Sequence, residues 1–172
     1  MNWMRSKSLL LITVFTLLIA GCKVRYGFNL TSLPEDIETV SVDFFTNNAS
    51  IVQPTLSQVF TEKLKDKFLT ETNLGLVPAN GDFAFSGEIV DYVVAPVSVQ
   101  SGNTTASLNR LTISIKTKFV CEKHPELGFD QVFTNFQDFD ASQDISAVEA
   151  TLIDEITDMT VQDIFNKSAV NW

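Results

Sequence analysis

Residues 110–121, RLTISIKTKFVC, alternate apolar and polar side chains at every position except Thr117 and Val120. One side of an extended chain carries Leu111, Ile113, Ile115, Phe119 and Cys121, and the other carries Arg110, Thr112, Ser114, Lys116 and Lys118. Because successive side chains of a strand point to opposite faces, this pattern predicts a half-buried β-strand with one apolar face. Such a strand belongs in an antiparallel sheet whose apolar face is covered by a second layer.

A second strand precedes this one, and a hairpin joins the two. Residues 80–82, NGD, are typical of a turn, and the alternating residues from Phe83 to Val94 follow them. Pro96 has no amide proton, so we expect the ladder between the two strands to end near it. Residues 101–105, SGNTT, are then the polar tip of the hairpin.

A third strand follows the central one. Residues 124–128, HPELG, indicate a turn, and residues 129–139 predict a strand that is rich in phenylalanine. The spacing from Phe133 to Phe136 breaks strict alternation. That irregularity predicts a β-bulge between these two residues.

Two segments have helical periodicity, and one further strand precedes them. Residues 54–70 and 146–166 place apolar residues three and four positions apart, which predicts two amphipathic helices. Each segment begins with the spacing of a capping box. The capping pairs are Thr55 with Gln58 and Ser146 with Glu149. Residues 37–45 alternate and predict the first strand, with Phe44 among the residues of its buried face.

The element order is therefore strand, helix, three strands, helix. It predicts an α+β fold, a two-layer sandwich in which a four-stranded, mostly antiparallel sheet carries both helices on one face. The first strand reaches the sheet by crossing over through the first helix, so one parallel pair is expected.

The N-terminus has the features of a bacterial lipoprotein signal peptide. Arg5 and Lys7 precede a short apolar run, which ends in residues 18–22, LIAGC. Cleavage before Cys22 and acylation of that residue would anchor the chain in a membrane. An ordinary signal peptide or an uncleaved anchor is the alternative. On the lipoprotein interpretation, residues 1–21 are the signal peptide, 22–34 are the acylated cysteine and a tether, and 35–172 are one sandwich domain.

Charge and cysteine content restrict the possible partners. The chain has 12 Lys and Arg against 21 Asp and Glu, for a net charge of −9, and loss of Arg5 and Lys7 would make the mature charge −11. Such an acidic chain is not expected to bind nucleic acid. With Cys22 acylated, Cys121 has no cysteine partner. Its place on the apolar strand face predicts a buried free thiol rather than a reactive one.

We find no catalytic constellation in the sequence, so we do not expect an enzyme. The single histidine, His124, lies in a predicted turn, where an ordinary surface role is the simpler interpretation. Asp138, Asp140 and Asp144 suggest calcium, but the glycine and glutamate of an EF-hand loop do not follow them. A solvated loop is the alternative, and no metal site is predicted.

One basic row is a candidate binding surface. Arg110, Lys116 and Lys118 lie on the polar face of the central strand, where they can contact phosphate groups or a protein partner. The alternative is a strand face that simply meets solvent.

The mature chain resembles the LptE family of lipopolysaccharide-assembly lipoproteins, in the form found in Bacteroidetes. The resemblance is carried by the lipobox at 18–22, IETVSVDFF at 37–45, PTLSQ at 54–58, FTEKL at 60–64, DKFL at 66–69, GDF at 81–83, GEI at 87–89, DY at 91–92, NRLTI at 109–113 and QDIFN at 162–166. It implies an outer-membrane lipoprotein on the periplasmic side, without catalytic activity. It also implies that the domain plugs the LptD β-barrel, assists its assembly and takes part in lipopolysaccharide transport.

The resemblance therefore implies LptD as partner, lipopolysaccharide as a possible ligand, the membrane as a contact through the lipid anchor, and no cofactor besides the acyl chains on Cys22. The alternative is a stand-alone periplasmic lipoprotein that binds a small molecule or lipid between phenylalanine side chains. The candidate lining residues are Phe83, Phe85, Phe129, Phe133 and Phe136.

Overall fold

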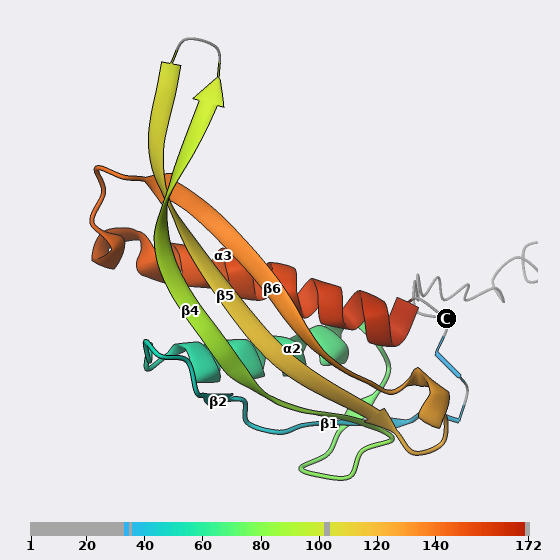
Figure 1. The fold of residues 1–172 in the computed structure, drawn as a ribbon. Coiled ribbons are helices and arrows are strands. Elements are labelled where there is room, and N and C mark those ends of the chain that lie inside the picture. Colours follow the sequence, from blue (N-terminus) through green and yellow to red (C-terminus); the bar gives the residue numbers. More distant parts are fainter. Residues whose placement is uncertain (1–32, 35, 102–103, 171–172) are drawn as a thin grey trace, which may run out of the picture.

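The computed structural model describes residues 33–34, 36–101 and 104–170, so the predicted signal peptide, Cys22 and most of the tether lie outside the described residues. The fold is α+β, with one sheet and both long helices on the same side of it (Figure 1). The elements are β1 (Thr39–Val42), β2 (Thr46–Asn47), α2 (Leu56–Glu71), β3 (Gly75–Leu76), β4 (Phe83–Ser101), β5 (Thr104–Cys121), the 3₁₀ turn η1 (Pro125–Leu127), β6 (Phe129–Asp140), α3 (Ile145–Phe165) and the π-helical turn η2 (Asn166–Val170).

The sheet has six strands rather than the predicted four. Its order is β3-β1-β4-β5-β6, and β2 pairs with β4 beside this path. The two added strands, β2 and β3, are two residues long, which is too short for a period to show in the sequence. The predicted crossover is confirmed, because β1 runs parallel to β4 while β4, β5 and β6 are antiparallel.

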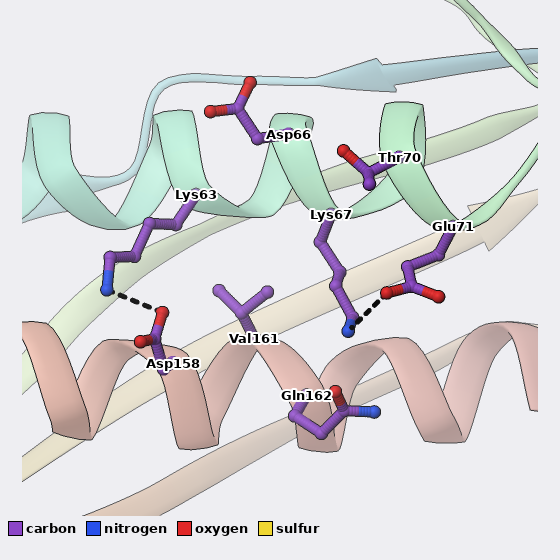
Figure 2. A pocket seen from close by; sticks show the side chains of 8 residues that line it. All are labelled: Lys63, Asp66, Lys67, Thr70, Glu71, Asp158, Val161 and Gln162. Atoms are coloured by element: carbon purple, nitrogen blue, oxygen red, sulfur yellow. Dashed lines mark hydrogen bonds and ion pairs between the residues drawn. The ribbon is translucent and has the colours of Figure 1, made fainter.

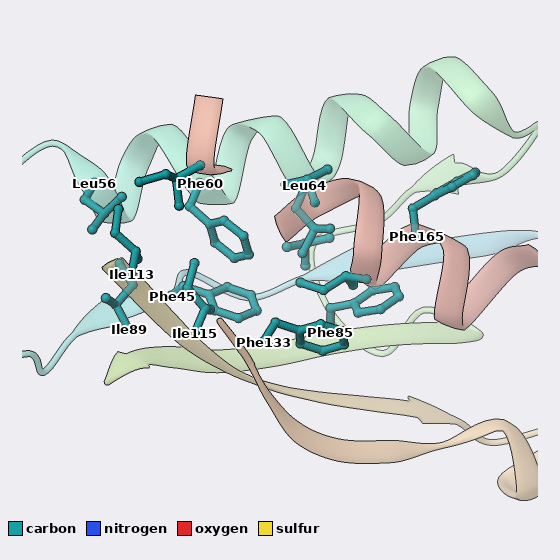
Figure 3. Packing of buried hydrophobic residues seen from close by; sticks show 14 of the residues in the cluster. Phe45, Leu56, Phe60, Leu64, Phe85, Ile89, Ile113, Ile115, Phe133 and Phe165 are labelled. Carbon is teal, nitrogen blue, oxygen red and sulfur yellow. The ribbon is translucent and has the colours of Figure 1, made fainter. Parts of the chain in front are cut away.

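The core lies between the sheet and the helices. The alternation of β5 is confirmed: its five apolar residues from Leu111 to Cys121 are at most 1% exposed. Side chains of α2 such as Phe60 and Leu64 point down onto this face, and Phe165 of α3 joins them (Figure 3). The contact Phe85–Phe119 is a stacked ring pair with centroids 4.7 Å apart. Burial of this many large apolar groups is the main force that holds the layers together.

The predicted inward position of Phe44 is wrong. The chain leaves the β1 ladder after Val42, and Phe45 turns inward instead, fully buried, while Phe44 is 61% exposed. The Phe45 amide donates a 3.1 Å hydrogen bond to Thr61 Oγ1, and its ring lies edge-on to Phe60 at 4.9 Å. Contacts with α2, which strand alternation does not report, decide which phenylalanine is buried.

Both predicted capping boxes are wrong, although both helices are present. At α2, Gln53 Oε1 accepts hydrogen bonds from the amides of Thr55 and Leu56 at 2.7 and 2.9 Å, and Thr55 gives no side-chain cap. At α3 the cap is Asp144, whose carboxylate accepts from the Ser146 amide at 2.9 Å. An oxygen-bearing side chain just outside the helix satisfies the first amides in both cases.

The predicted end of the β4–β5 ladder near Pro96 is wrong. Pro96 pairs with Asn109, and the ladder continues to Ser101 opposite Thr104. Among the described residues β4 has no neighbour on its other side after Ile89, so a missing amide proton there is tolerated at a free edge. Residues 104–105, expected in the hairpin tip, belong to β5, and 102–103 lie outside the described residues.

The predicted bulge is in the wrong strand. The register of β6 against β5 is continuous from Phe129 to Asp140, and the register shift occurs in β4 between Ile89 and Asp91. Without a bulge, Phe136 falls on the face of the sheet away from the helices and is 45% exposed. Since β6 stops at Asp140 opposite Leu108, the hairpin continues beyond it as a two-stranded ribbon, at the top of Figure 1.

Candidate functional site

The candidate site is the face of the sheet opposite the helices, here called the outer face. No helix among the described residues covers it (Figure 1). All three predicted basic residues lie on it, because Arg110, Lys116 and Lys118 occupy alternate positions of β5. The face also carries exposed apolar side chains between the polar ones. These apolar residues are Val93, Val120, Val132 and Phe136.

Arg110 is held by its neighbours on β6. Its Nε and Nη2 donate to the two carboxylate oxygens of Asp138 at 2.7 and 2.9 Å, and its guanidinium lies 3.7 Å from the ring centroid of Phe136. The hydrogen bond between them raises the pKa of Arg110 and lowers the pKa of Asp138. A bidentate pair stacked on a ring fixes the guanidinium plane and occupies one edge of its donors. The structure thus separates Arg110 from the two lysines in chemical environment.

Lys116 and Lys118 border an open hollow of about 290 Å³ on the outer face. Lys116 Nζ is 3.8 Å from Asp130 Oδ1, at the limit of an ion pair, and both side chains are about half exposed. Lys118 forms no ion pair with any described residue. Thr46, Ser86, Gly87 and Glu88 complete the lining. An exposed cation beside hydroxyl groups can bind an anionic oxygen of a ligand.

A second depression, of about 370 Å³, lies between α2 and α3 (Figure 2). Its cations are already paired. Lys63 Nζ donates to Asp158 Oδ1 at 2.6 Å and to the Asp154 carbonyl at 2.8 Å, and Lys67 pairs with Glu71 at 3.3 Å. Figure 2 shows Lys63 reaching from α2 toward α3. The Lys63 contacts join α2 to α3, and the Lys67 pair lies within α2, so we interpret this depression as part of the helix packing rather than as a second site.

His124 takes part in a polar cluster that sequence reasoning missed. Its Nε2 lies 3.1 Å from Asp36 Oδ1, and this hydrogen bond raises the pKa of the imidazole. Nearby, Asp82 Oδ2 accepts from the amides of Glu38 and Thr39 at 3.0 Å, and its Oδ1 pairs with Lys123 Nζ at 2.8 Å. The ion pair with Lys123, followed by the backbone amide donors, lowers the pKa of Asp82 strongly. The partners are more than 40 residues apart, so no sequence pattern announces the cluster.

The calcium candidates do not come together. Asp138 pairs with Arg110, Asp140 accepts from Ser142, and Asp144 caps α3. Within the described ranges, no group of three or more His, Cys, Asp or Glu side chains could hold a metal ion. The remaining thiol, Cys121, is 1% exposed, and burial raises its pKa, which keeps it protonated.

The phenylalanine layer is packed rather than hollow. Phe83 and Phe85 both contact Phe119 with ring centroids 4.8 and 4.7 Å away, and Phe129 lies 5.8 Å from Phe133. Phe136 is separated from these rings by the sheet itself. The five residues considered as a lipid pocket therefore do not line one common cavity.

The LptE family model, described as lipopolysaccharide-assembly, matches residues 37–168. No curated protein matches the chain significantly. A structure of the hypothetical protein CT253 from Chlamydia trachomatis is similar, with a TM-score of 0.50 and 10% identity over 76% of this chain and 94% of that one. At this identity the likeness concerns the fold alone.

Two further structures have lower scores. The minor lipoprotein from Acinetobacter baumannii has a TM-score of 0.44 and 14% identity over 77% of this chain and 96% of that one. The uncharacterized lipoprotein B from Nitrosomonas europaea has a TM-score of 0.46 and 18% identity over 84% of this chain and 87% of that one. No helix in the described part of this chain is long and apolar enough to cross a membrane.

Proposed function

The chain belongs to the LptE family of lipopolysaccharide-assembly lipoproteins, which is non-enzymatic and associated with the outer membrane, and from this premise we propose a more specific role. The protein is a lipid-anchored plug of the LptD β-barrel on the periplasmic side of the outer membrane. It assists assembly of the barrel and takes part in the transport of lipopolysaccharide to the cell surface.

The match of the family model to residues 37–168 carries this proposal, because it spans the whole described sandwich from β1 to α3. The uncovered outer face supports it. A face with four exposed apolar side chains and a few charges is suited to a protein partner. Depletion of the protein should reduce both folded LptD and surface lipopolysaccharide; unchanged levels of both would contradict the proposal.

Membrane attachment through acylated Cys22 is the second part of the proposal. The lipobox at residues 18–22 supports it. Replacement Cys22→Ser should give an unprocessed chain that takes up no labelled palmitate. Replacement Cys121→Ser is the matched control, and it should leave labelling unchanged because that thiol is buried. Equal labelling of Cys22→Ser and the unaltered chain would overturn this part.

We assign contact with the anionic groups of lipopolysaccharide to Lys116 and Lys118. Lys118 supports this assignment most directly, since it has no ion pair among the described residues and borders an open hollow. For Arg110 the contact stays a prediction, as Asp138 and Phe136 already engage its guanidinium.

Charge reversal tests the assignment. Lys118→Glu should weaken binding of purified lipopolysaccharide to the detergent-solubilised protein about fivefold to tenfold, the effect of one lost charge-assisted contact and one new repulsion. Lys65→Glu on α2, a partly buried lysine whose ion pair among the described residues is with Glu62, is the control with the same charge change. Equal weakening by both variants would show that binding depends on net charge alone, and it would contradict the assignment of a site at Lys118.

Affinity purification from outer membranes separates this proposal from the alternative of a stand-alone lipoprotein. Recovery of LptD with the protein supports the plug. A monomer that comes without a barrel would favour the stand-alone role.

A further inference from the structure

The two-stranded ribbon at the end of the β4–β5 hairpin is a feature that the fold itself does not need. Among the described residues, 98–101 and 104–106 pair only with each other, since β6 ends opposite Leu108 and the Ala141 amide still donates to the Ser107 carbonyl at 3.3 Å. The hairpin extends past the helices and past every other strand (Figure 1). An isolated two-stranded hairpin is marginally stable in water, so a ribbon that stands alone calls for a reason.

The composition of this hairpin differs from that of the rest of the chain. From Tyr92 to Asn109 there is no Asp, Glu, Lys, Arg or His, whereas 19% of the whole chain is charged. Exposed strand edges are normally protected by charged residues, and the edge strand β6 carries Asp130, Asp138 and Asp140. A ribbon without charge can be desolvated at low cost. That composition suits burial against another protein surface.

Arg110 and its partners hold the ribbon on the outer face, at the level where it leaves the sheet. Arg110 is paired in register with Asp138, and Phe136 lies two residues further back along β6. The bidentate ion pair and the stacked ring together bind β5 to the end of β6. Leu108, two residues closer to the hairpin tip than Arg110, is the last residue of β5 that pairs with β6.

Tyr92 makes a second contact on the inner face, three ladder positions further from the ribbon, because it pairs with Ile113 while Arg110 pairs with Ala95. Tyr92 is 3% exposed, and its hydroxyl donates a 2.5 Å hydrogen bond to Glu149 Oε1 in the second turn of α3. The aromatic ring thus joins β4 to the helix layer just after the register shift between Ile89 and Asp91. Two contacts on opposite faces therefore restrain the hairpin before the ribbon begins, one to β6 near its base and one to α3 further back.

We propose that Arg110–Asp138–Phe136 and Tyr92–Glu149 form a two-sided clamp, which fixes the direction of the uncharged ribbon so that it docks on an uncharged surface of a protein partner. Arg110 and Tyr92 are then positioning residues and not ligand-binding ones. The identity of that partner as the LptD barrel rests on the function proposed above. The existence of the clamp does not depend on that function.

Hydrogen exchange tests the clamp without any partner. In the detergent-solubilised full chain, amides of the ribbon should exchange about fivefold faster in Arg110→Lys and in Tyr92→Phe than in the unaltered protein. Arg110→Lys is the decisive variant, because it keeps the positive charge but loses the planar fork and the stacking. Lys65→Gln, which removes a cation of α2 whose ion pair is with Glu62 on the same helix, should leave the rates unchanged. Unchanged rates in both clamp variants would overturn the clamp.

Copurification of LptD tests the docking. Gln100→Lys with Thr105→Lys places two charges on opposed ribbon positions and should reduce recovery of the barrel at least about tenfold, since buried unpaired charge is costly. Thr70→Lys with Asn73→Lys adds the same charge at exposed positions near the end of α2. This variant should recover as much LptD as the unaltered protein. Full recovery with the charged ribbon would overturn the docking.

The outcomes separate the inference from the proposed function. If unaltered protein recovers no LptD, the barrel role fails, while the exchange result still decides the clamp. If unaltered protein recovers LptD and the charged ribbon recovers it equally, the barrel role stands and the docking by the ribbon is wrong.

Discussion

Replacement of Thr117 by valine should stabilise the protein. Thr117 lies on the inner face of β5, opposite Gly87 in β4, and is fully buried. Its Oγ1 has no hydrogen-bond partner among the described residues. Valine has nearly the same shape, favours strands and has no polar group to desolvate. The substitution therefore removes a cost and leaves the packing nearly unchanged.

The magnitude follows from the desolvation of one hydroxyl. A buried polar group without a partner costs about 1–3 kcal/mol, and part of that is offset because valine fills the site slightly differently. We expect a gain of about 1–2 kcal/mol in the free energy of unfolding. For a chain of this size that corresponds to a Tm increase of about 3–6 °C.

Thr157→Val is the matched control. Thr157 is also fully buried, but its Oγ1 donates to the Ile153 carbonyl at 2.7 Å. The same substitution there removes a made hydrogen bond and should cost about 0.5–1.5 kcal/mol. Urea unfolding of both variants, followed by circular dichroism, measures the two shifts. A loss of stability in Thr117→Val, or equal shifts in both variants, would show that the Thr117 hydroxyl is satisfied.

Three further outcomes are expected. Gly87→Ala should destabilise by about 1–3 kcal/mol, because the added Cβ would overlap the Lys116 carbonyl and the Phe45 ring, and a lowered midpoint in urea measures it. Pairing of protonated His124 with Asp36 stabilises the folded protein at a pH below the ordinary histidine pKa of 6.5, and this stabilisation is lost as the pH rises through the raised pKa of the folded state. Between about pH 6 and pH 8, the free energy of unfolding should therefore fall less in His124→Gln than in the unaltered protein. Cys121 should react with a maleimide only after unfolding, and mass spectrometry of the native protein would detect any earlier labelling.

The strand faces and the helices were predictable because their periods are local. Each side chain of β5 from Leu111 to Cys121 lies on the face of the sheet that alternation predicts. The ends of α2 and α3 lie within two residues of the predicted ends. The crossover followed from the order of elements, since a strand that returns through a helix must pair in parallel. Two-residue strands have no period, and so β2 and β3 could not be anticipated.

The candidate site was predictable only as a set of positions. Alternation placed Arg110, Lys116 and Lys118 on one face, and the structure has them there. It did not distinguish them. Asp138 and Phe136 engage Arg110 because β6 has no bulge and brings residues 26 to 28 positions away into register, and no local pattern reports that.

The sequence alone determined the family and the layer arrangement, because these depend on the order and spacing of residues along the chain. Tertiary structure decided which phenylalanine enters the core at β1, which lysine remains without an ion pair, and where the ribbon leaves the sheet. Each of these depends on which distant side chain lies within a few ångströms. That is a property of packing and register, which short-range periodicity does not contain.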